Sequence, residues 1–198
     1  MATTSTNEMI LVMGDVHIPN RINAIPNEIK TTLKNSKSKF NKIICTGNYG
    51  DTETHTWLKS LLGKGCENNF YTVKTEDKST LTQPPTQVIT SNEFKIGVIN
   101  GFQLVPWGDL TALSSIQKQL NCDILIHGHI HIKSVYHFEG KWYINPGSIT
   151  GAFSALRNNP SPSFIIIVTV DDVASVYTYE LNQTTKAFDI EKVEITKA

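Results

Sequence analysis

The sequence predicts an α/β protein in which two packed sheets of mixed strand pairing carry helices on their outer faces. Three observations lead to this prediction. The first half of the chain alternates short apolar runs with segments of helical periodicity, and the second half is mostly strand hairpins. The 198 residues, of which 39% are hydrophobic, suit one domain with a substantial core. We expect this domain to span 9–198, after a flexible polar tail over 1–8.

The first half is expected to form three strands and two helices. Pro26 precedes the first helix, in which Ile29 and Leu33 stand four residues apart on one face. The second helix opens with Asp51 as a capping residue and ends at Gly63. The expected elements are, in chain order, strand 9–15, helix 27–36, strand 41–48, helix 51–63 and strand 69–73.

One helix, which begins at Asp109, interrupts the strands expected in the second half. Turn residues at 91–92 and 139–140 separate apolar runs and predict hairpins. The expected elements are, in chain order, a loop over 75–85, a hairpin over 86–101, a helix over 109–120, a strand over 123–129, hairpins over 134–146 and 163–181, and a last strand near 188–196.

Charge and cysteine content exclude several functions. The 18 basic residues balance the 18 acidic residues, so no global field would attract nucleic acid or anionic lipid. The three cysteines, Cys45, Cys66 and Cys122, are odd in number and lack zinc or redox spacing, which indicates reduced thiols in a cytoplasmic protein, with Cys45 buried. No stretch approaches the roughly 20 apolar residues of a membrane span, so we expect membrane association only through a partner.

Polar residues that can bind metals follow three of the expected strands. Because the carboxyl ends of neighbouring strands converge in α/β folds, these residues are expected to lie close together. In an extended loop, alternate residues point to the same side, so the histidines of "IHGHIH" can share one cluster of ions. The candidates are Asp15 and His17, Asn48 and Asp51, and His127, His129 and His131.

Several of these candidates also have a purely structural interpretation. His17 can stabilise a loop, Asn48 can be a turn residue, and Asp51 can be the N-cap of the next helix. A lone histidine is more often a satisfied core residue than a ligand. Neighbours at alternate positions, such as His129 and His131, are rarely explained by packing alone.

Taken together, the motifs "GD-x-H", "GN-x-x-D" and "GH-x-H", each after a strand, resemble the calcineurin-like metallophosphoesterases. The resemblance implies a four-layer α-β-β-α sandwich that holds two divalent ions about 3.5–4 Å apart, which activate water and clamp a phosphate ester. The stretches "VPWGD" and "INPGSITGA" are similar to one branch of this family, the small subunits of the retromer complex. This resemblance runs from about residue 9 to 195.

The chain departs from the catalytic pattern of the resembled family at several positions. Asn48 stands where active members have an aspartate that bridges both ions, and Asn100 and Phe102 replace two further polar positions. The stretch that matches the general-acid motif places Glu76 near a ligand position and Asp77 near the acid, without a histidine. We therefore expect no enzyme activity, because neither a stable ion pair nor a proton donor remains.

The remaining ligands suggest that no cofactor is required and that one divalent ion, zinc or manganese, binds weakly. The resemblance implies a first ion position at Asp15, His17, His131 and Asn48, and a second at Asn48, His129 and Glu76, with Asn100 in the place of another ligand.

Two partner surfaces are implied by the same resemblance. The loop "QLVPWGD" matches a docking loop for the long helical solenoid subunit of retromer, vacuolar protein sorting 35, with Val105 and Trp107 as apolar anchors. Ile166, Tyr177 and Tyr179 match a patch that binds regulators of small GTPases. Ordinary loop packing and an internal sheet face are the alternatives. The expected role is a non-catalytic scaffold for endosome-to-Golgi or plasma-membrane transport, in the cytoplasm and on endosomes through the complex.

Two other functions compete with the scaffold. An active metal-dependent phosphodiesterase is favoured by the surviving Asp15, His17, His129 and His131. A nucleic-acid binder is disfavoured by the zero net charge.

Overall fold

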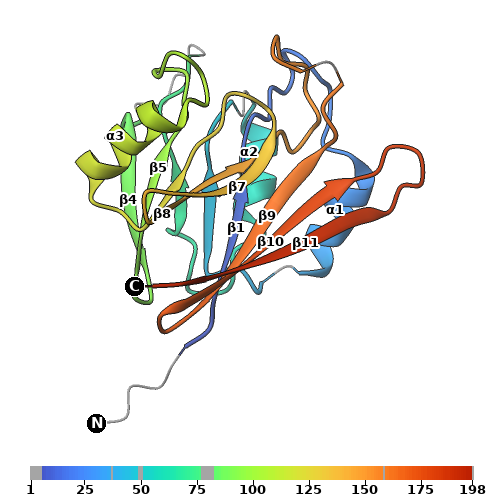
Figure 1. Cartoon of the computed structure of the whole chain (residues 1–198). Coiled ribbons are helices and arrows are strands. Elements are labelled where there is room, and N and C mark those ends of the chain that lie inside the picture. The colour runs from blue at the N-terminus through green and yellow to red at the C-terminus, as the bar shows by residue number, and fades with distance from the viewer. Residues whose placement is uncertain (1–5, 37, 49–50, 77–82, 158, 198) are drawn as a thin grey trace.

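The computed structural model describes residues 6–36, 38–48, 51–76, 83–157 and 159–197. Figure 1 shows two sheets with helices on the outside. The first sheet contains, in spatial order, β11 (Phe188–Thr196), β10 (Val173–Leu181), β9 (Ser163–Val170), β1 (Glu8–Met13), β2 (Lys42–Cys45) and β3 (Phe70–Thr72). The second contains β4 (Thr86–Ser91), β5 (Phe94–Ile99), β6 (Ile124–Ile126), β8 (Lys141–Pro146) and β7 (Lys133–Phe138).

Both sheets are mixed, as the sequence predicts. In the first, β1 pairs with β2 in parallel and with β9 antiparallel. In the second, β6 is parallel to both β5 and β8, while β4 and β7 add antiparallel edges. The predicted α/β class with two mixed sheets and outer helices is confirmed.

Three hydrophobic clusters separate the layers. The first joins the inner faces of the two sheets and includes Val12 and Ile126. The second lies beneath α1 (Asn27–Asn35) and α2 (Thr52–Lys59), where Leu33 is buried. The third packs α3 (Leu110–Leu120) onto the second sheet through Leu113 and Tyr143. Among the described residues, no helix is both long and apolar enough to cross a bilayer.

Every strand and helix expected from the sequence is present, but several end earlier than predicted. β2 ends at Cys45 and β6 at Ile126, because the residues that follow turn into loops in which Asn48 and His129 adopt positive φ angles. α2 ends at Lys59, four residues before Gly63. Of the predicted loop over 75–85, residues 77–82 lie outside the described part of the chain.

Both ends of the described chain are attached at the pole opposite the carboxyl ends of β1 and β6 (Figure 1). Glu8, which we placed in the polar tail, is the first residue of β1 and accepts hydrogen bonds from Lys42 Nζ and Ser91 Oγ, each at 2.5 Å. Ser91 belongs to the second sheet, so Glu8 links both sheets. Near the other terminus, Lys197 Nζ lies 3.4 Å from a carboxylate oxygen of Asp123.

Candidate metal centre and docking surfaces

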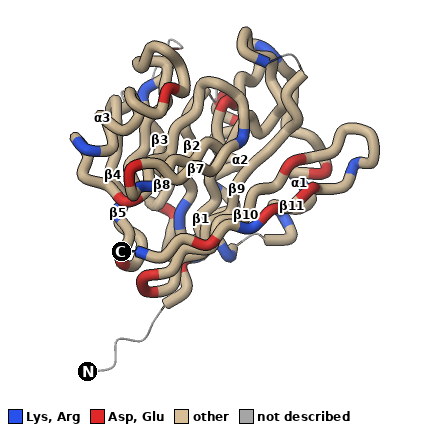
Figure 2. The backbone as a smooth tube through the Cα atoms, in the orientation of Figure 1, with Lys and Arg blue, Asp and Glu red and all other residues tan. Residues whose placement is uncertain are grey.

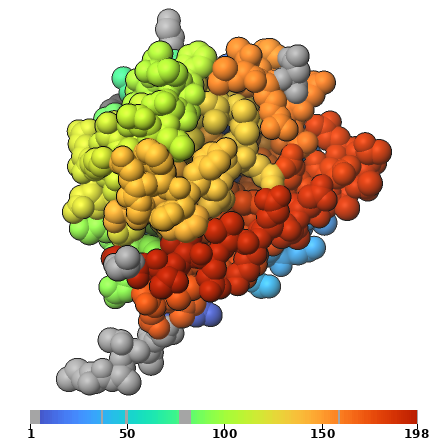
Figure 3. Space-filling model, viewed as in Figure 1, coloured from blue at the N-terminus to red at the C-terminus, as the bar shows by residue number. Residues whose placement is uncertain are grey.

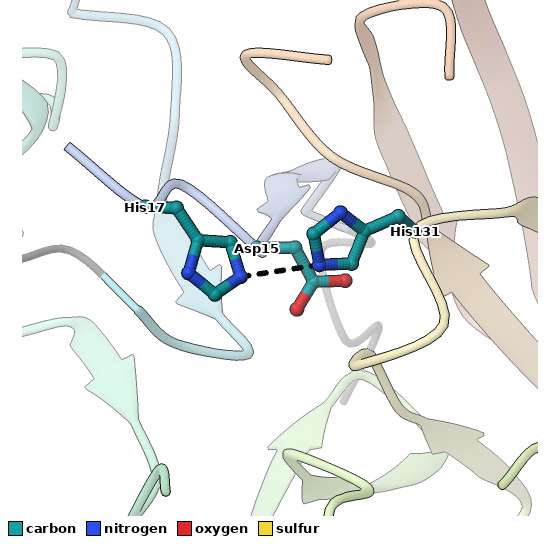
Figure 4. A group of neighbouring side chains, drawn as sticks. All are labelled: Asp15, His17 and His131. Carbon is teal, nitrogen blue, oxygen red and sulfur yellow. Dashed lines mark hydrogen bonds between the residues drawn. The ribbon is translucent and has the colours of Figure 1, made fainter. Parts of the chain in front are cut away.

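Asp15, His17 and His131 form a buried cluster at the carboxyl ends of β1 and β6 (Figure 4). Asp15 and His17 follow β1, and His131 comes from the loop after β6. One potential ligand atom from each residue lies within 4.8 Å of the others. The sequence analysis placed these three residues in one group, and the structure brings them together, because β1 and β6 end at the same pole of the two sheets.

The backbone of this cluster is held in an unusual conformation. Asp15, His17 and His131 have φ angles of 47°, 51° and 58°, in the left-handed region that residues other than glycine seldom adopt. Hydrogen bonds from two side chains fix the loop after β1: Ser148 Oγ donates to Asp15 O at 2.7 Å, and Thr150 Oγ1 to Val16 O at 2.9 Å. Backbone strain that the surrounding structure maintains is typical of functional sites.

The hydrogen bonds of His131 indicate which ring nitrogen carries the proton in each of the two imidazoles. Its Nδ1 lies 2.6 Å from Ala152 O and therefore donates, which leaves Nε2 with a lone pair. This Nε2 lies 3.1 Å from His17 Nε2, so His17 donates there. Burial, with a smaller contribution from Arg21, lowers the pKa of His17 to about 3, and burial lowers the pKa of His131. Both rings are neutral at pH 7, the form that binds metals.

Asp15 completes a donor set that fits a divalent ion. Burial raises its pKa to about 7, although His129 N donates to Oδ1 at 3.0 Å. The other carboxylate oxygen, Oδ2, is buried and has no hydrogen-bond partner among the described residues. A buried oxygen without a partner beside two neutral imidazoles is the environment that zinc or manganese would satisfy.

The neighbouring half of the polar site has a different character. Asn100 Nδ2 donates to Thr46 O at 2.7 Å and to Asn48 Oδ1 at 3.3 Å, so the two amides contact each other. His129 Nδ1 lies 3.7 Å from Glu76 Oε1. The sequence therefore correctly places Glu76 near His129, and the two asparagines together.

The structure places His129 beside the close group of Asp15, His17 and His131 but not within it. The ring of His129 packs edge-on against Trp107, with centroids 4.6 Å apart, and is not a member of the close cluster of Asp15. With φ angles of 73° and 58°, His129 and His131 are not in extended backbone, so the rule that alternate side chains share a side does not apply.

Other candidates have structural roles. Asp51 is the N-cap of α2, where Oδ1 accepts from Thr54 N at 2.5 Å. His127 is fully buried, its Nδ1 lies 3.3 Å from Asn145 Nδ2, and burial lowers its pKa to about 4. Asp77 lies outside the described residues. Cys45 is buried as predicted, and burial raises the pKa of its thiol to about 12.

The expected docking loop over 103–109 lies beside this polar site, because Trp107 packs on His129. Val105 is 80% exposed and Trp107 is 45% exposed. Trp107 is held in place because its Nε1 donates to Phe102 O at 3.4 Å and its ring packs on His129. Val105 is therefore an exposed apolar side chain next to a positioned aromatic ring.

The second predicted surface is the outer face of β9–β11. Tyr179 stacks on Phe164, with ring centroids 4.7 Å apart, and contacts Phe188 edge-on. Tyr177 is partly buried beneath Lys192, whereas Ile190 is 55% exposed.

Ile166, predicted to belong to this surface, is only 8% exposed and therefore offers little area to a partner. Phe188 and Ile190 were missed by the sequence analysis. Their alternate spacing on β11 is the signal that places them on the side of the tyrosines.

Comparisons with known proteins agree with this architecture. The calcineurin-like phosphoesterase superfamily domain matches residues 9–172. Vacuolar protein sorting-associated protein 29 of Schizosaccharomyces pombe is 32% identical over 177 residues, which are 87% of this chain and 91% of that protein. The chain therefore belongs to the calcineurin-like phosphoesterase superfamily, and within it to the Vps29 family.

Solved structures of Vps29 extend the likeness to three dimensions. The protein from Cryptosporidium parvum superposes with a TM-score of 0.88 at 32% identity, over 96% of this chain and 99% of that one. The Entamoeba histolytica protein, solved in complex with Zn²⁺, superposes with a TM-score of 0.85 at 36% identity, over 94% of this chain and 98% of that one.

Proposed function

We propose that this protein is a non-catalytic scaffold subunit of retromer that docks onto the helical solenoid subunit, vacuolar protein sorting 35, for retrograde transport of cargo from endosomes to the Golgi or plasma membrane. Membership of the Vps29 family supports a role in vacuolar protein sorting. The observation that carries the docking is Val105, which is 80% exposed beside the half-exposed Trp107. Large apolar side chains exposed together are typical of a protein interface.

The absence of catalysis is proposed from the amide half of the site. Asn48 and Asn100 satisfy each other through a hydrogen bond and supply no negative charge. Two dications about 4 Å apart repel strongly, and a neutral amide offsets little of that repulsion. His129, the remaining candidate ligand there, packs against Trp107 of the docking loop.

One divalent ion, zinc or manganese, is proposed at Asp15, His17 and His131, with no ion required for folding. Asp15 Oδ2, which has no hydrogen-bond partner in the described part of the chain, and the two neutral imidazoles support this assignment. The Zn²⁺ complex of the Entamoeba histolytica relative is consistent with it. Such an ion would act as a Lewis acid, and its structural effect would be to cross-link the loops that follow β1 and β6.

The face of Tyr177 and Tyr179 is the proposed contact for regulators of small GTPases. Tyr179 stacks on Phe164 and contacts Phe188 edge-on, which fixes its ring, and the neighbouring Ile190 is exposed. Through these two surfaces the protein would act in the cytoplasm and reach endosomal membranes only as part of the complex.

Calorimetric titration with the purified full-length solenoid subunit tests the proposal. We expect the wild type to bind and Val105→Asp to lose binding, because a charge would replace an exposed apolar anchor. Ile190→Asp is the matched control, since it places the same charge at an exposed aliphatic residue on another face. Absence of binding by the wild type would refute the scaffold role, and full binding by Val105→Asp would refute the docking loop.

An active phosphodiesterase is the second candidate, and the intact cluster of Asp15, His17 and His131 favours it. Hydrolysis of bis(p-nitrophenyl) phosphate with added manganese, compared between the wild type and His17→Ala, is the test. Turnover that depends on His17 would contradict the proposed absence of catalysis and support a phosphodiesterase.

A further inference from the structure

Two adjacent loops border the metal cluster opposite the docking loop. They span 18–25 and 151–157, and we call them the arginine rim. We propose that the arginine rim is a second contact surface, which takes an acidic segment with an apolar side chain from the partner bound by the docking loop. This inference rests on the proposed function.

The composition of the rim sets the chemistry of its ligand. Arg21 and Arg157 are the only arginines of the chain, and both lie on these loops. The segments 18–25 and 147–162 contain no aspartate or glutamate. In Figure 2 the blue segments of these loops lie close together at the upper right of the molecule. Two arginines on loops that contain no acids of their own are complementary to carboxylates, which the planar guanidinium fork binds in bidentate fashion.

Hydrogen bonds attach the rim to the metal cluster. Ala152 O accepts from His131 Nδ1 at 2.6 Å, and the next carbonyl, Phe153 O, accepts from Arg21 Nη1 at 3.0 Å. Two consecutive carbonyls therefore hold a proposed ligand of the ion and one arginine of the rim. Because a guanidinium has five N–H donors, Arg21 retains donors for a partner after making this bond. The surface is preorganised, which lowers the entropy lost on binding.

Two large apolar side chains accompany the arginines. Phe153 is 56% exposed and Leu156 is 50% exposed. The turn that presents them is fixed by Ser154, whose Oγ accepts from Leu156 N at 3.2 Å and whose carbonyl accepts from Arg157 N at 3.1 Å. Apolar side chains between arginines are the combination enriched in protein interfaces.

The position of the rim favours the partner of the docking loop over other occupants. Figure 3 shows the docking loop in green and the 151–157 loop of the rim in orange as two raised edges, with the yellow segment near residue 130 between them. A partner that contacts Val105 and Trp107 on one edge can reach Phe153 on the other. An anionic membrane is a weaker match, because membrane-binding segments cluster about 4–8 basic residues and the rim has two.

The test is calorimetric titration with the full-length solenoid subunit at low and moderate salt. We expect Arg21→Glu/Arg157→Glu to weaken binding about tenfold or more and to reduce its salt dependence. The matched control is Lys39→Glu/Lys64→Glu, which makes the same change of charge at exposed residues near the amino end of β2, at the opposite pole. Phe153→Ser, which removes the apolar side chain without adding a charge, is expected to weaken binding independently of salt.

Each outcome decides the proposal. Binding by the double arginine variant within about twofold of wild type, or an equal loss in the lysine control, would overturn the rim while the scaffold role stands. Failure of the wild type to bind would overturn both. Arginine-dependent flotation with anionic vesicles, or arginine-dependent self-association in sedimentation equilibrium, without an effect on solenoid binding would assign the rim to another occupant and overturn the proposal.

Discussion

The two halves of the polar site differ in how their buried groups are satisfied. In the half formed by Asp15, His17 and His131, a carboxylate oxygen has no hydrogen-bond partner among the described residues. In the half formed around Asn48 and Asn100, the amides bond to each other and to the backbone. One half therefore keeps a buried carboxylate oxygen suited to a cation, whereas the amides of the other half are hydrogen-bonded and carry no charge.

This difference agrees with the proposed scaffold, in which the reaction is lost and a site for one ion remains. Replacing a bridging carboxylate by an amide removes the charge that a second ion needs, and the same amide restores hydrogen bonding in the space left. The first half keeps the carboxylate of Asp15 and therefore the negative charge that an ion needs.

The largest expected effect is loss of zinc binding in His131→Ala. Zinc affinity, measured by calorimetry, should fall about 100-fold or more, because one of three protein ligands is removed. His137→Ala, which removes an exposed histidine from β7, is the control and should bind as the wild type does. Unchanged affinity in His131→Ala would show that zinc binds elsewhere.

Next in size is the effect of Asp15→Asn on stability without metal. The folded-state pKa of Asp15 is about 7, raised by burial from 3.8, so this group lowers wild-type stability as pH rises from about 4 to 7. The shift corresponds to a loss of wild-type stability of roughly 4 kcal/mol at pH values above 7. Asp15→Asn removes this loss, but its unsatisfied amide N–H costs about 1–3 kcal/mol.

We therefore expect the free energy of unfolding of Asp15→Asn, measured in urea at pH 8 with a chelator, to exceed that of wild type by roughly 1–3 kcal/mol. This gain should disappear near pH 4. Added zinc should stabilise only the wild type. A variant less stable than wild type at pH 8 would show that the carboxylate is better solvated than its burial implies.

A smaller effect is expected from Asn48→Asp, which returns a carboxylate to the amide half. Manganese should then bind with two ions per chain instead of one, with an affinity gain of about tenfold for the second ion. Asn48→Ala controls for loss of the amide. A stoichiometry that stays at one would mean that Asn100 and the position of His129 also block the second ion.

The smallest effect is expected from His129→Ala. Zinc affinity should change less than about threefold, because the ring of His129 faces Glu76 and Trp107 instead of the cluster. A loss as large as that of His131→Ala would contradict the division of the site into two halves.

The sequence predicts most of the fold, because its strands are short apolar runs ended by turn residues and its helices have caps. Asp51 and Asp109 are both N-caps as expected. The pairing of Asp15 and His17 with His131 was also predictable, since strand ends converge.

The remainder depends on tertiary geometry that local patterns do not encode. The ring of His129 packs against Trp107, a contact between residues 22 positions apart that no local pattern announces. Ile166 is buried although it is the direct partner of the partly exposed Tyr177 in the pairing of β9 with β10. The bond between Arg21 and Phe153 O joins residues 132 positions apart and has no signature in either loop.

The attachment of both chain ends at one pole has a practical consequence for experiments. Glu8 and Lys197 anchor the chain at the pole away from the docking loop and the rim. A capture tag on either terminus would therefore orient immobilised molecules on a biosensor with both contact surfaces toward the flowing analyte. A fluorescent protein fused at either terminus would likewise be carried on the side of the molecule that faces away from the proposed partner.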